Sequence, residues 1–221
     1  NNMTHEFKTP IATINLALDA LKNPKVSDNK EFIARYHNMI REENRRMHTQ
    51  VENVLRISKL ENDELDLEKG DLNLHYIIED AIAHTSLIIE NKGGYIKTHL
   101  NALNYSIYGS DNHLTNIVVN IIDNAIKYSK GIPEIDIYTE NQGNFLILKI
   151  QDKGIGMSKV VQNKIFEKFY REQMGNIHNV KGHGLGLSYV KRILDDHDAE
   201  INVESEKGKG STFSIKFHLI S

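Results

Sequence analysis

The chain has 221 residues, which is long enough for two modest domains or for one domain with a helical appendage. Its net charge of −3 and its 26% of charged residues offer no basic surface for nucleic acid. It has no cysteine, which excludes disulfides, thiolate catalysis and cysteine–zinc sites, and its 11 histidines lack the spacing of metal ligands. No apolar run approaches the roughly 20 residues that span a bilayer. Because the first residue already lies in a helical pattern, we expect a fragment of a longer protein.

Residues 1–62 are expected to form a helical hairpin. The first helix carries apolar residues at spacings of four and three, the pattern of a coiled-coil seam: Phe7, Ile11, Ile14, Leu18 and Leu21. After a break at Pro24, the second helix is expected from about Ser27, a candidate N-cap, to about Glu61. Two helices cover little of the apolar surface, which predicts a dimeric four-helix bundle. The alternative is a monomeric hairpin that packs on the rest of the chain.

His5 lies nearly opposite the apolar seam, so its imidazole is expected to face solvent. An exposed imidazole near its ordinary pKa of about 6.5 is a competent nucleophile. Glu6 is adjacent, Thr9 lies one turn further on the same side, and Pro10 removes the hydrogen bond to the Glu6 carbonyl. A lone surface histidine is usually only a solvated side chain. The interpretation as a nucleophile therefore requires a phosphoryl donor elsewhere in the chain.

After a linker at 62–64, the periodicity changes to that of a layered domain. Strands are expected near Leu65–Lys69, Tyr95–Leu100, Ser106–Tyr108, Glu134–Thr139, Phe145–Gln151, Ala199–Ser205 and Thr212–Leu219. Helical patterns lie near Leu74–Glu90, Asp111–Tyr128, Lys159–Phe166 and Leu185–Asp196. Turn residues at 141–144 and 207–210 join neighbouring strands as hairpins. This mixture favours an α+β sandwich, with helices on one face of a largely antiparallel sheet, over a Rossmann fold.

One expected helix, Asp111–Tyr128, carries asparagines opposite its apolar stripe. Asn116, Asn120 and Asn124 recur at one-turn spacing, although asparagine is a poor helix former. They could be a solvated polar face. The functional alternative is that their amide oxygens bind a hard cation such as Mg²⁺, with Lys127 reaching a phosphate.

Three later segments have the residue types of a nucleotide site. Asp152 follows a predicted strand, where its carboxylate could accept a hydrogen bond from adenine N6, although a plain turn would use the same residues. Residues 165–171 join aromatic side chains to a cation, and the polar segment 172–181 could be a mobile lid or an idle loop. Residues 182–188 (Gly-His-Gly-Leu-Gly-Leu-Ser) open into a helical pattern, where bare backbone N–H groups can approach a phosphate.

Together these segments make the chain resemble a bacterial sensor histidine kinase. The boxes of that family are matched in the family order at 5–10 (H-box), 120–129 (N-box), 152–157 (G1), 165–171 (F) and 182–188 (G2). The resemblance implies a dimerisation and histidine-phosphotransfer hairpin at 1–62, followed by a Bergerat-fold catalytic and ATP-binding domain at 65–221. It also implies that the fragment lies in the cytoplasm and that its parent is anchored in the inner membrane.

The resemblance implies roles for individual residues. His5 would take the γ-phosphoryl group of ATP, Glu6 would orient the imidazole or accept its proton, and Thr9 would position a water for dephosphorylation of the partner. Asn124, with Asn120, would hold Mg²⁺ against the phosphates. The other residues implied to bind ATP are Lys127, Tyr128, Asp152, Gly154, Gly156, Arg171, Gly182, Gly184, Leu185 and Gly186. The implied partners are a second copy of the hairpin and the receiver domain of a response regulator.

Two alternatives and one departure from the family pattern follow from the same residues. A Bergerat-fold ATPase of the chaperone or DNA-repair kind would turn over ATP without forming a phosphoprotein, but the hairpin that carries His5 argues against it. A dimeric adaptor with a degenerate nucleotide site is disfavoured because all the expected residue types are present. His183 stands where many relatives have a small residue.

Overall fold

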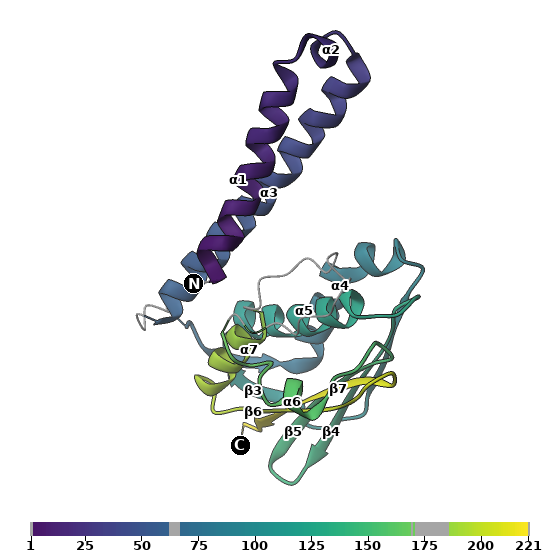
Figure 1. Cartoon of the computed structure of the whole chain (residues 1–221). Helices are drawn as coiled ribbons and strands as arrows, with labels where there is room; N and C mark the ends of the chain where they lie inside the picture. The colour runs from purple at the N-terminus through teal and green to yellow at the C-terminus, as the bar shows by residue number, and fades with distance from the viewer. Residues whose placement is uncertain (1, 62–66, 169, 171–185, 221) are drawn as a thin grey trace. The chain divides into compact units, whose positions relative to one another are not determined.

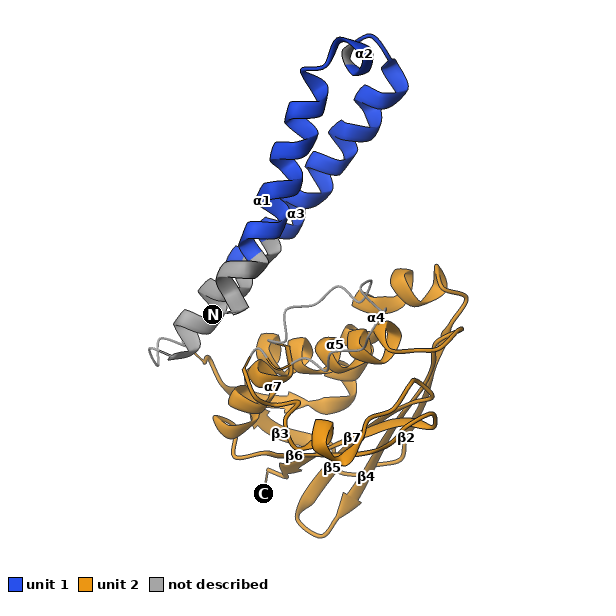
Figure 2. Ribbon diagram, in the orientation of Figure 1, with its two compact units in different colours: residues 1–65 blue, residues 66–221 orange. Residues whose placement is uncertain are grey.

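The computed structural model describes residues 2–61, 67–168, 170 and 186–220 (Figure 1). The chain divides into two compact units, Asn1–Leu65 and Asp66–Ser221 (Figure 2). In the first unit, side chains are described for residues 7–26, 28–48 and 51. None of the helices in the described part of the chain has both the length and the hydropathy that a membrane crossing requires.

The first unit is the predicted helical hairpin, made of α1 (Asn2–Leu21), a short α2 (Pro24–Ser27) and α3 (Lys30–Glu61). The predicted N-cap of the second long helix was wrong, because Ser27 is the last residue of α2. Asn29 takes that part instead: its side-chain oxygen accepts hydrogen bonds from the backbone N–H groups of Glu31, at 2.9 Å, and Phe32, at 3.3 Å. The α3 helix therefore begins at Lys30, three residues later than the sequence suggested.

The hairpin packs through small residues of α1 and leaves large apolar ones uncovered. Pro10 and Ala17 are buried, and they lie seven residues apart on one face of α1. By contrast, Ile11 is 44% exposed, Leu16 is 71% exposed and Leu18 is 45% exposed. Part of the seam predicted from the sequence is thus not covered by α3, although α1 and α3 contact each other along the hairpin.

The second unit is the predicted α+β sandwich. Its elements are β1 (Gly70–Asn73), α4 (Leu74–Glu90), β2 (Tyr95–Leu100), β3 (Ser106–Gly109), α5 (Asp111–Lys127), β4 (Glu134–Gln142), β5 (Phe145–Asp152), α6 (Lys159–Gln162), α7 (Gly186–Asp195), β6 (Glu200–Glu206) and β7 (Gly210–His218). The main sheet has the order β2-β4-β5-β7-β6, in which only the β2–β4 pairing is parallel. A separate antiparallel pair joins β1 to β3. Helices α4, α5 and α7 lie together on one face of the main sheet (Figure 1).

Two predicted elements were misplaced. Residues 67–69 are not in a strand, and β1 begins at Gly70, where it pairs with Gly109 of β3. β1 ends at Asn73 because the Asn73 side chain turns to cap α4, accepting a hydrogen bond from the His75 N–H at 2.9 Å. The α6 helix ends at Gln162, earlier than predicted, and the following residues form turns.

The main sheet has one apolar face and one charged face. Buried residues alternate along its strands and pack beneath the helices: Ile135, Ile137, Leu146, Leu148, Ile150, Phe213 and Ile215. The opposite face carries cross-strand ion pairs, such as Lys153 with Glu134 at 2.6 Å and Lys149 with Glu140 at 2.7 Å. In β5 the residues at 146, 148 and 150 are buried beneath the helices, and the same alternation places Asp152 on that face.

Candidate active site

The asparagine ridge of α5 presents amide oxygens. The Asn116 Nδ2 donates to the carbonyl of Asn112 at 2.6 Å, and the Asn120 Nδ2 donates to the carbonyl of Asn116 at 2.7 Å. Each amide nitrogen is therefore turned back to the helix, so the amide oxygen of the same group points away from that carbonyl. Asn124 lies half-buried one turn later on the ridge. Oxygen acceptors of this kind are suitable ligands for Mg²⁺.

The first residue of α7 lies against this ridge. A Cβ atom on Gly186 would lie 2.8 Å from the Asn120 Oδ1, so only a glycine fits here without a shift of the asparagine. The N-terminal turn of an α-helix carries unpaired N–H groups and a partial positive charge. An acceptor oxygen that suits a cation and a helix terminus that suits an anion thus lie side by side, as a bound metal phosphate requires.

Asp152 is a buried carboxylate at the end of the central strand β5, with 7% of its surface exposed. Its Oδ1 accepts a hydrogen bond from the Gly154 N–H at 2.7 Å, and the backbone N–H of Ser211 in β7 also donates to the carboxylate. Burial raises the pKa of Asp152, and the two backbone hydrogen bonds offset part of that rise. A carboxyl group held in this way is a strong, fixed hydrogen-bond acceptor when ionised.

The turn after Asp152 is fastened to the C-terminal end of α5. The Tyr128 carbonyl accepts a hydrogen bond from the Ile155 N–H at 3.0 Å. A Cβ on Gly154 would lie 2.6 Å from the same carbonyl oxygen, so the two backbones touch at this point. The Tyr128 side chain is 37% exposed. The fold thereby joins Asp152 to the helix that also carries Asn120.

The hairpin between β6 and β7 supports the other side of the turn, a role that sequence reasoning missed. Gly156 has φ +63°, and a Cβ there would lie 1.9 Å from the Glu206 carbonyl oxygen. The Gly208 N–H donates to the Ile155 carbonyl at 2.7 Å. Gly210, at φ +102°, leaves room for the Asp152 carbonyl oxygen, 1.9 Å from where its Cβ would be. The two glycines within 207–210 could have indicated this support, but they were assigned only to a hairpin turn.

Several predicted site residues are not brought to this site by the described structure. The Lys127 ammonium forms an ion pair with Asp123 one turn earlier on α5, so its contact with a phosphate stays a prediction. Thr9 is exposed on α1. His5 and Glu6 lie on α1, but their side chains are outside the described residues, as are Arg171, Gly182, Gly184 and Leu185 altogether. Among the residues that the structure does describe, no cluster of His, Asp or Glu could hold a metal ion.

Two family models match the chain. One, the "Histidine kinase-, DNA gyrase B-, and HSP90-like ATPase" model, matches residues 109–221, and the other, the "His Kinase A (phospho-acceptor) domain" model, matches residues 1–63. The chain belongs to the two-component sensor histidine kinases, and this confirms the predicted fold class.

Individual relatives agree with this assignment. The chain is 42% identical to the sensor protein RprX of Bacteroides fragilis over 224 residues, covering 100% of this chain and 43% of RprX. It is 33% identical to the heme sensor protein HssS of Staphylococcus saprophyticus, covering 98% and 45% of the two chains. The chain therefore spans about half the length, or less, of these curated relatives.

The same fold occurs in the crystal structure of the histidine kinase ThkA in complex with the response regulator TrrA. The TM-score is 0.79 at 22% identity, and the match covers 99% of this chain and 60% of that one.

Proposed function

We propose that this chain is the kinase core of a sensor histidine kinase that phosphorylates its own His5 and passes the phosphoryl group to an aspartate of a receiver domain. In the first step the bond between the γ-phosphorus and the oxygen bridging it to the β-phosphate breaks. A bond from that phosphorus to an imidazole nitrogen forms, ADP leaves, and Glu6 accepts the proton that the imidazole loses. In the second step the nitrogen–phosphorus bond breaks as an aspartate oxygen of the receiver takes the phosphoryl group.

The buried carboxylate of Asp152 is the single observation that carries the assignment of the ATP site. Burial of the ionised carboxylate costs stability, and the two backbone hydrogen bonds offset only part of that cost. A buried carboxylate at this position is therefore explained best by a ligand that binds to it. The exocyclic N6 amine of adenine is such a ligand, because it donates hydrogen bonds and has no charge. Tyr128, at the end of α5, would flank the base. The close approach of Gly154 to the Tyr128 carbonyl keeps Tyr128 near the turn that follows Asp152.

The phosphates would then lie toward Asn120 and Gly186. We assign Mg²⁺ to the amide oxygens of Asn120 and Asn124, with the phosphates supplying further oxygen ligands. When bound, the ion supplies positive charge that stabilises the charge developing on the phosphates during transfer. Lys127 and Arg171 would neutralise further phosphate charge, and the backbone of residues 182–186 would close over the phosphates.

The hairpin would supply the acceptor and the surface for the partners. Thr9, one turn beyond His5, would position a water that removes the phosphoryl group from the receiver domain. ThkA, whose fold this chain shares, was crystallised in complex with a response regulator, and this supports a receiver domain as the partner here. Steady ATP turnover without a labelled protein would favour instead the ATPases that share the fold.

A second copy of the chain would cover the apolar residues that the hairpin leaves exposed. Besides Ile11, Leu16 and Leu18 of α1, Phe32 of α3 is 42% exposed. Light scattering of the purified chain is expected to give the mass of a dimer, and an L16E variant is expected to weaken the dimer. A wild-type chain that stays monomeric at micromolar concentration would contradict dimerisation.

The central test uses ATP labelled on the γ-phosphate, with Mg²⁺. The wild-type chain is expected to acquire a phosphate that acid removes and base does not. The H5Q variant is expected to bind ATP with unchanged affinity but to acquire no label. Equal labelling of H5Q and wild type would rule out His5 as the acceptor. Transfer is then measured by adding receiver domains from the source organism, and loss of label from the kinase should accompany its gain by one receiver.

A further inference from the structure

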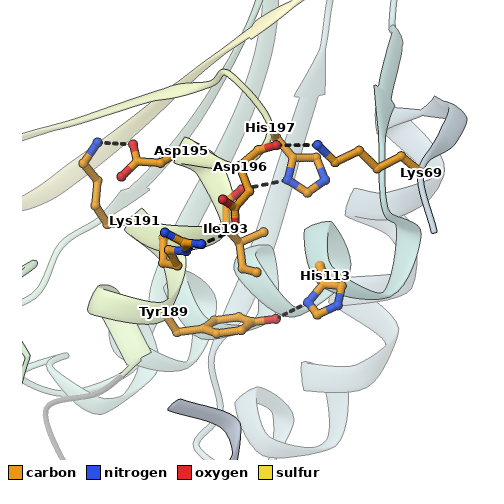
Figure 3. Close-up of polar contacts among 9 residues, drawn as sticks. Lys69, His113, Tyr189, Lys191, Ile193, Asp195, Asp196 and His197 are labelled. Atoms are coloured by element: carbon orange, nitrogen blue, oxygen red, sulfur yellow. Dashed lines mark hydrogen bonds and ion pairs between the residues drawn. The ribbon is translucent and has the colours of Figure 1, made fainter. Parts of the chain in front are cut away.

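Helices α5 and α7 are held together by polar contacts spaced along their length. The backbone N–H of Ser110, just before α5, donates to the His197 Nε2 at 3.0 Å. The His113 Nδ1 lies 2.8 Å from the Tyr189 hydroxyl (Figure 3). Further along the pair, the side chain of Asn120 packs closely against Gly186, as described above. As residue numbers rise along α5 they fall along α7, so the two helices run antiparallel and the Ser110 contact lies at the end remote from Gly186.

The imidazole of His197 is neutral and has one tautomer. Its Nδ1 lies 2.7 Å from the carbonyl of Ile193, so this nitrogen carries the proton and donates it. The Nε2 must then be the acceptor for the Ser110 N–H. Burial lowers the pKa of His197, and nearby Lys69 lowers it further, while the Ile193 carbonyl, Asp196 and Asp198 oppose that shift. Protonation would place a hydrogen on Nε2 and break the bond to Ser110.

The ring of His197 has little room to move. A Cβ on Gly109, the last residue of β3, would lie 2.8 Å from the His197 Cδ2 and 2.7 Å from the Leu114 Cδ1. The turn that follows α7 is fixed as well: Lys69 donates to the carbonyl of Asp196 (Figure 3). A cation at the C-terminal end of a helix also interacts favourably with the helix dipole. The C-terminal end of α7 is thus tied to β3 and to the segment preceding β1.

We propose that His197 is a positioning residue for the nucleotide site: by tying α7 to the start of α5, it holds Gly186 beside the amide oxygen of Asn120. The rise of an α-helix is about 1.5 Å per residue, so a slip of one residue would move Gly186 by that distance. Misplacement of a substrate-binding group by about 1 Å can reduce activity by about 100-fold. The inference rests on the proposed function in one respect, that ATP phosphates bind at the Gly186 end of α7.

The test compares two half-buried histidines of the same unit. His75 also has a pKa lowered by burial and a hydrogen bond, from its Nε2 to the Thr139 hydroxyl at 3.0 Å, but it lies on α4, away from the α5–α7 contacts. We expect H197F to weaken binding of a non-hydrolysable ATP analogue with Mg²⁺ by about tenfold or more in calorimetry. H75F is expected to lower the melting temperature to a similar degree and to change the affinity by less than about twofold.

The H197Q variant separates positioning from stability. A glutamine amide can donate to the Ile193 carbonyl and accept from the Ser110 N–H, so H197Q is expected to restore most of the affinity lost in H197F. The wild-type affinity is expected to fall as the pH drops through the pKa of His197, which burial places below the ordinary 6.5, and the fall is expected to be smaller in H197Q. Titration of the nucleotide itself is common to both proteins and cancels in the comparison. If H197F does not fold, these pH profiles decide the question.

The outcomes separate this inference from the proposed function. If the wild-type chain binds the analogue and H197F binds it equally well, or if wild type and H197Q have identical pH profiles, the positioning role of His197 is overturned. A wild-type chain that does not bind the analogue would overturn the assignment of the ATP site, and this inference with it.

Discussion

The amide oxygen of Asn120 lies where a side chain on Gly186 would have to go, because a Cβ at that position would be 2.8 Å from Oδ1. The contact joins the middle of α5 to the first residue of α7. Asparagine and glycine are both poor helix formers, and each is used here where a better helix former would close the site. Both residues thus lower the intrinsic helix propensity at the place where we propose that the phosphates and Mg²⁺ bind.

The G186A variant tests this relationship. The new methyl group meets the end of a flexible side chain, so Asn120 is expected to rotate and the protein to fold, with stability changed by less than about 1 kcal/mol. The affinity for ATP with Mg²⁺ is expected to fall by about tenfold or more, as measured by calorimetry. G70A is the control, because a Cβ at Gly70 meets nothing within 4 Å. Equal affinities for G186A and G70A would show that Asn120 need not stay in place.

The D152N variant is expected to gain stability and lose ATP binding. The raised pKa of Asp152 means that its ionised form is disfavoured in the folded chain, so the wild type is destabilised at neutral pH and recovers as acid protonates the group. The stability gained by D152N should thus be largest near pH 7 and shrink toward pH 4, in urea unfolding. ATP affinity is expected to fall about 10- to 100-fold, since an amide Nδ2 cannot accept from adenine N6. A D152N chain that binds ATP normally would contradict the base-reading role.

Two glycines with nearly the same φ angle should differ sharply in their tolerance of alanine. Gly143 has φ +60° with nothing within 4 Å of its Cβ position, whereas Gly156 has φ +63° with the Glu206 carbonyl oxygen 1.9 Å away. We expect G143A to cost about 1 kcal/mol, the penalty of the left-handed conformation. G156A is expected to cost about 3 kcal/mol or more, because the β6–β7 hairpin must also move. Similar urea midpoints for the two variants would contradict the contact.

His75 is expected to make the stability depend on pH. Burial lowers its pKa from the ordinary value of 6.5, and the charge of Glu79 only partly opposes this shift. Between the lowered pKa and 6.5 the unfolded chain binds more protons, so stability is complete above about pH 6.5 and declines as the pH falls through that window. The H75Q variant lacks this titration and should show a shallower decline in urea unfolding between pH 7 and 5. Parallel curves for the two proteins would exclude the effect.

Local pattern was sufficient for much of the fold. The alternation of Leu146, Leu148 and Ile150 indicates a strand with one buried face, and it ends at Asp152, the predicted reader of the base. Local pattern failed at the start of α3, where two residues are suitable N-caps. Ser27 and Asn29 could both cap the helix, and Asn29 does so because residues 24–27 form a helical turn of their own.

The parts of the site that sequence could not supply are long-range contacts. Ser110 and His197 are 87 residues apart in sequence, and nothing in the neighbourhood of either residue signals the other. The fit of Gly210 around the Asp152 carbonyl likewise depends on the pairing of β5 with β7. Periodicity describes each strand by itself and does not specify which strand lies beside it.

Asp152 ends β5, and β5 is the middle strand of the main sheet. Edge strands such as β2 and β6 have a neighbour on one side only, so local unfolding opens them first, and a central strand exchanges its amide hydrogens slowest. The residue proposed to recognise the base is thus carried by the part of the domain that opens last. Fluctuations that detach the edge strand β2 would leave Asp152 in place, because β5 keeps its pairing with β7 on the other side.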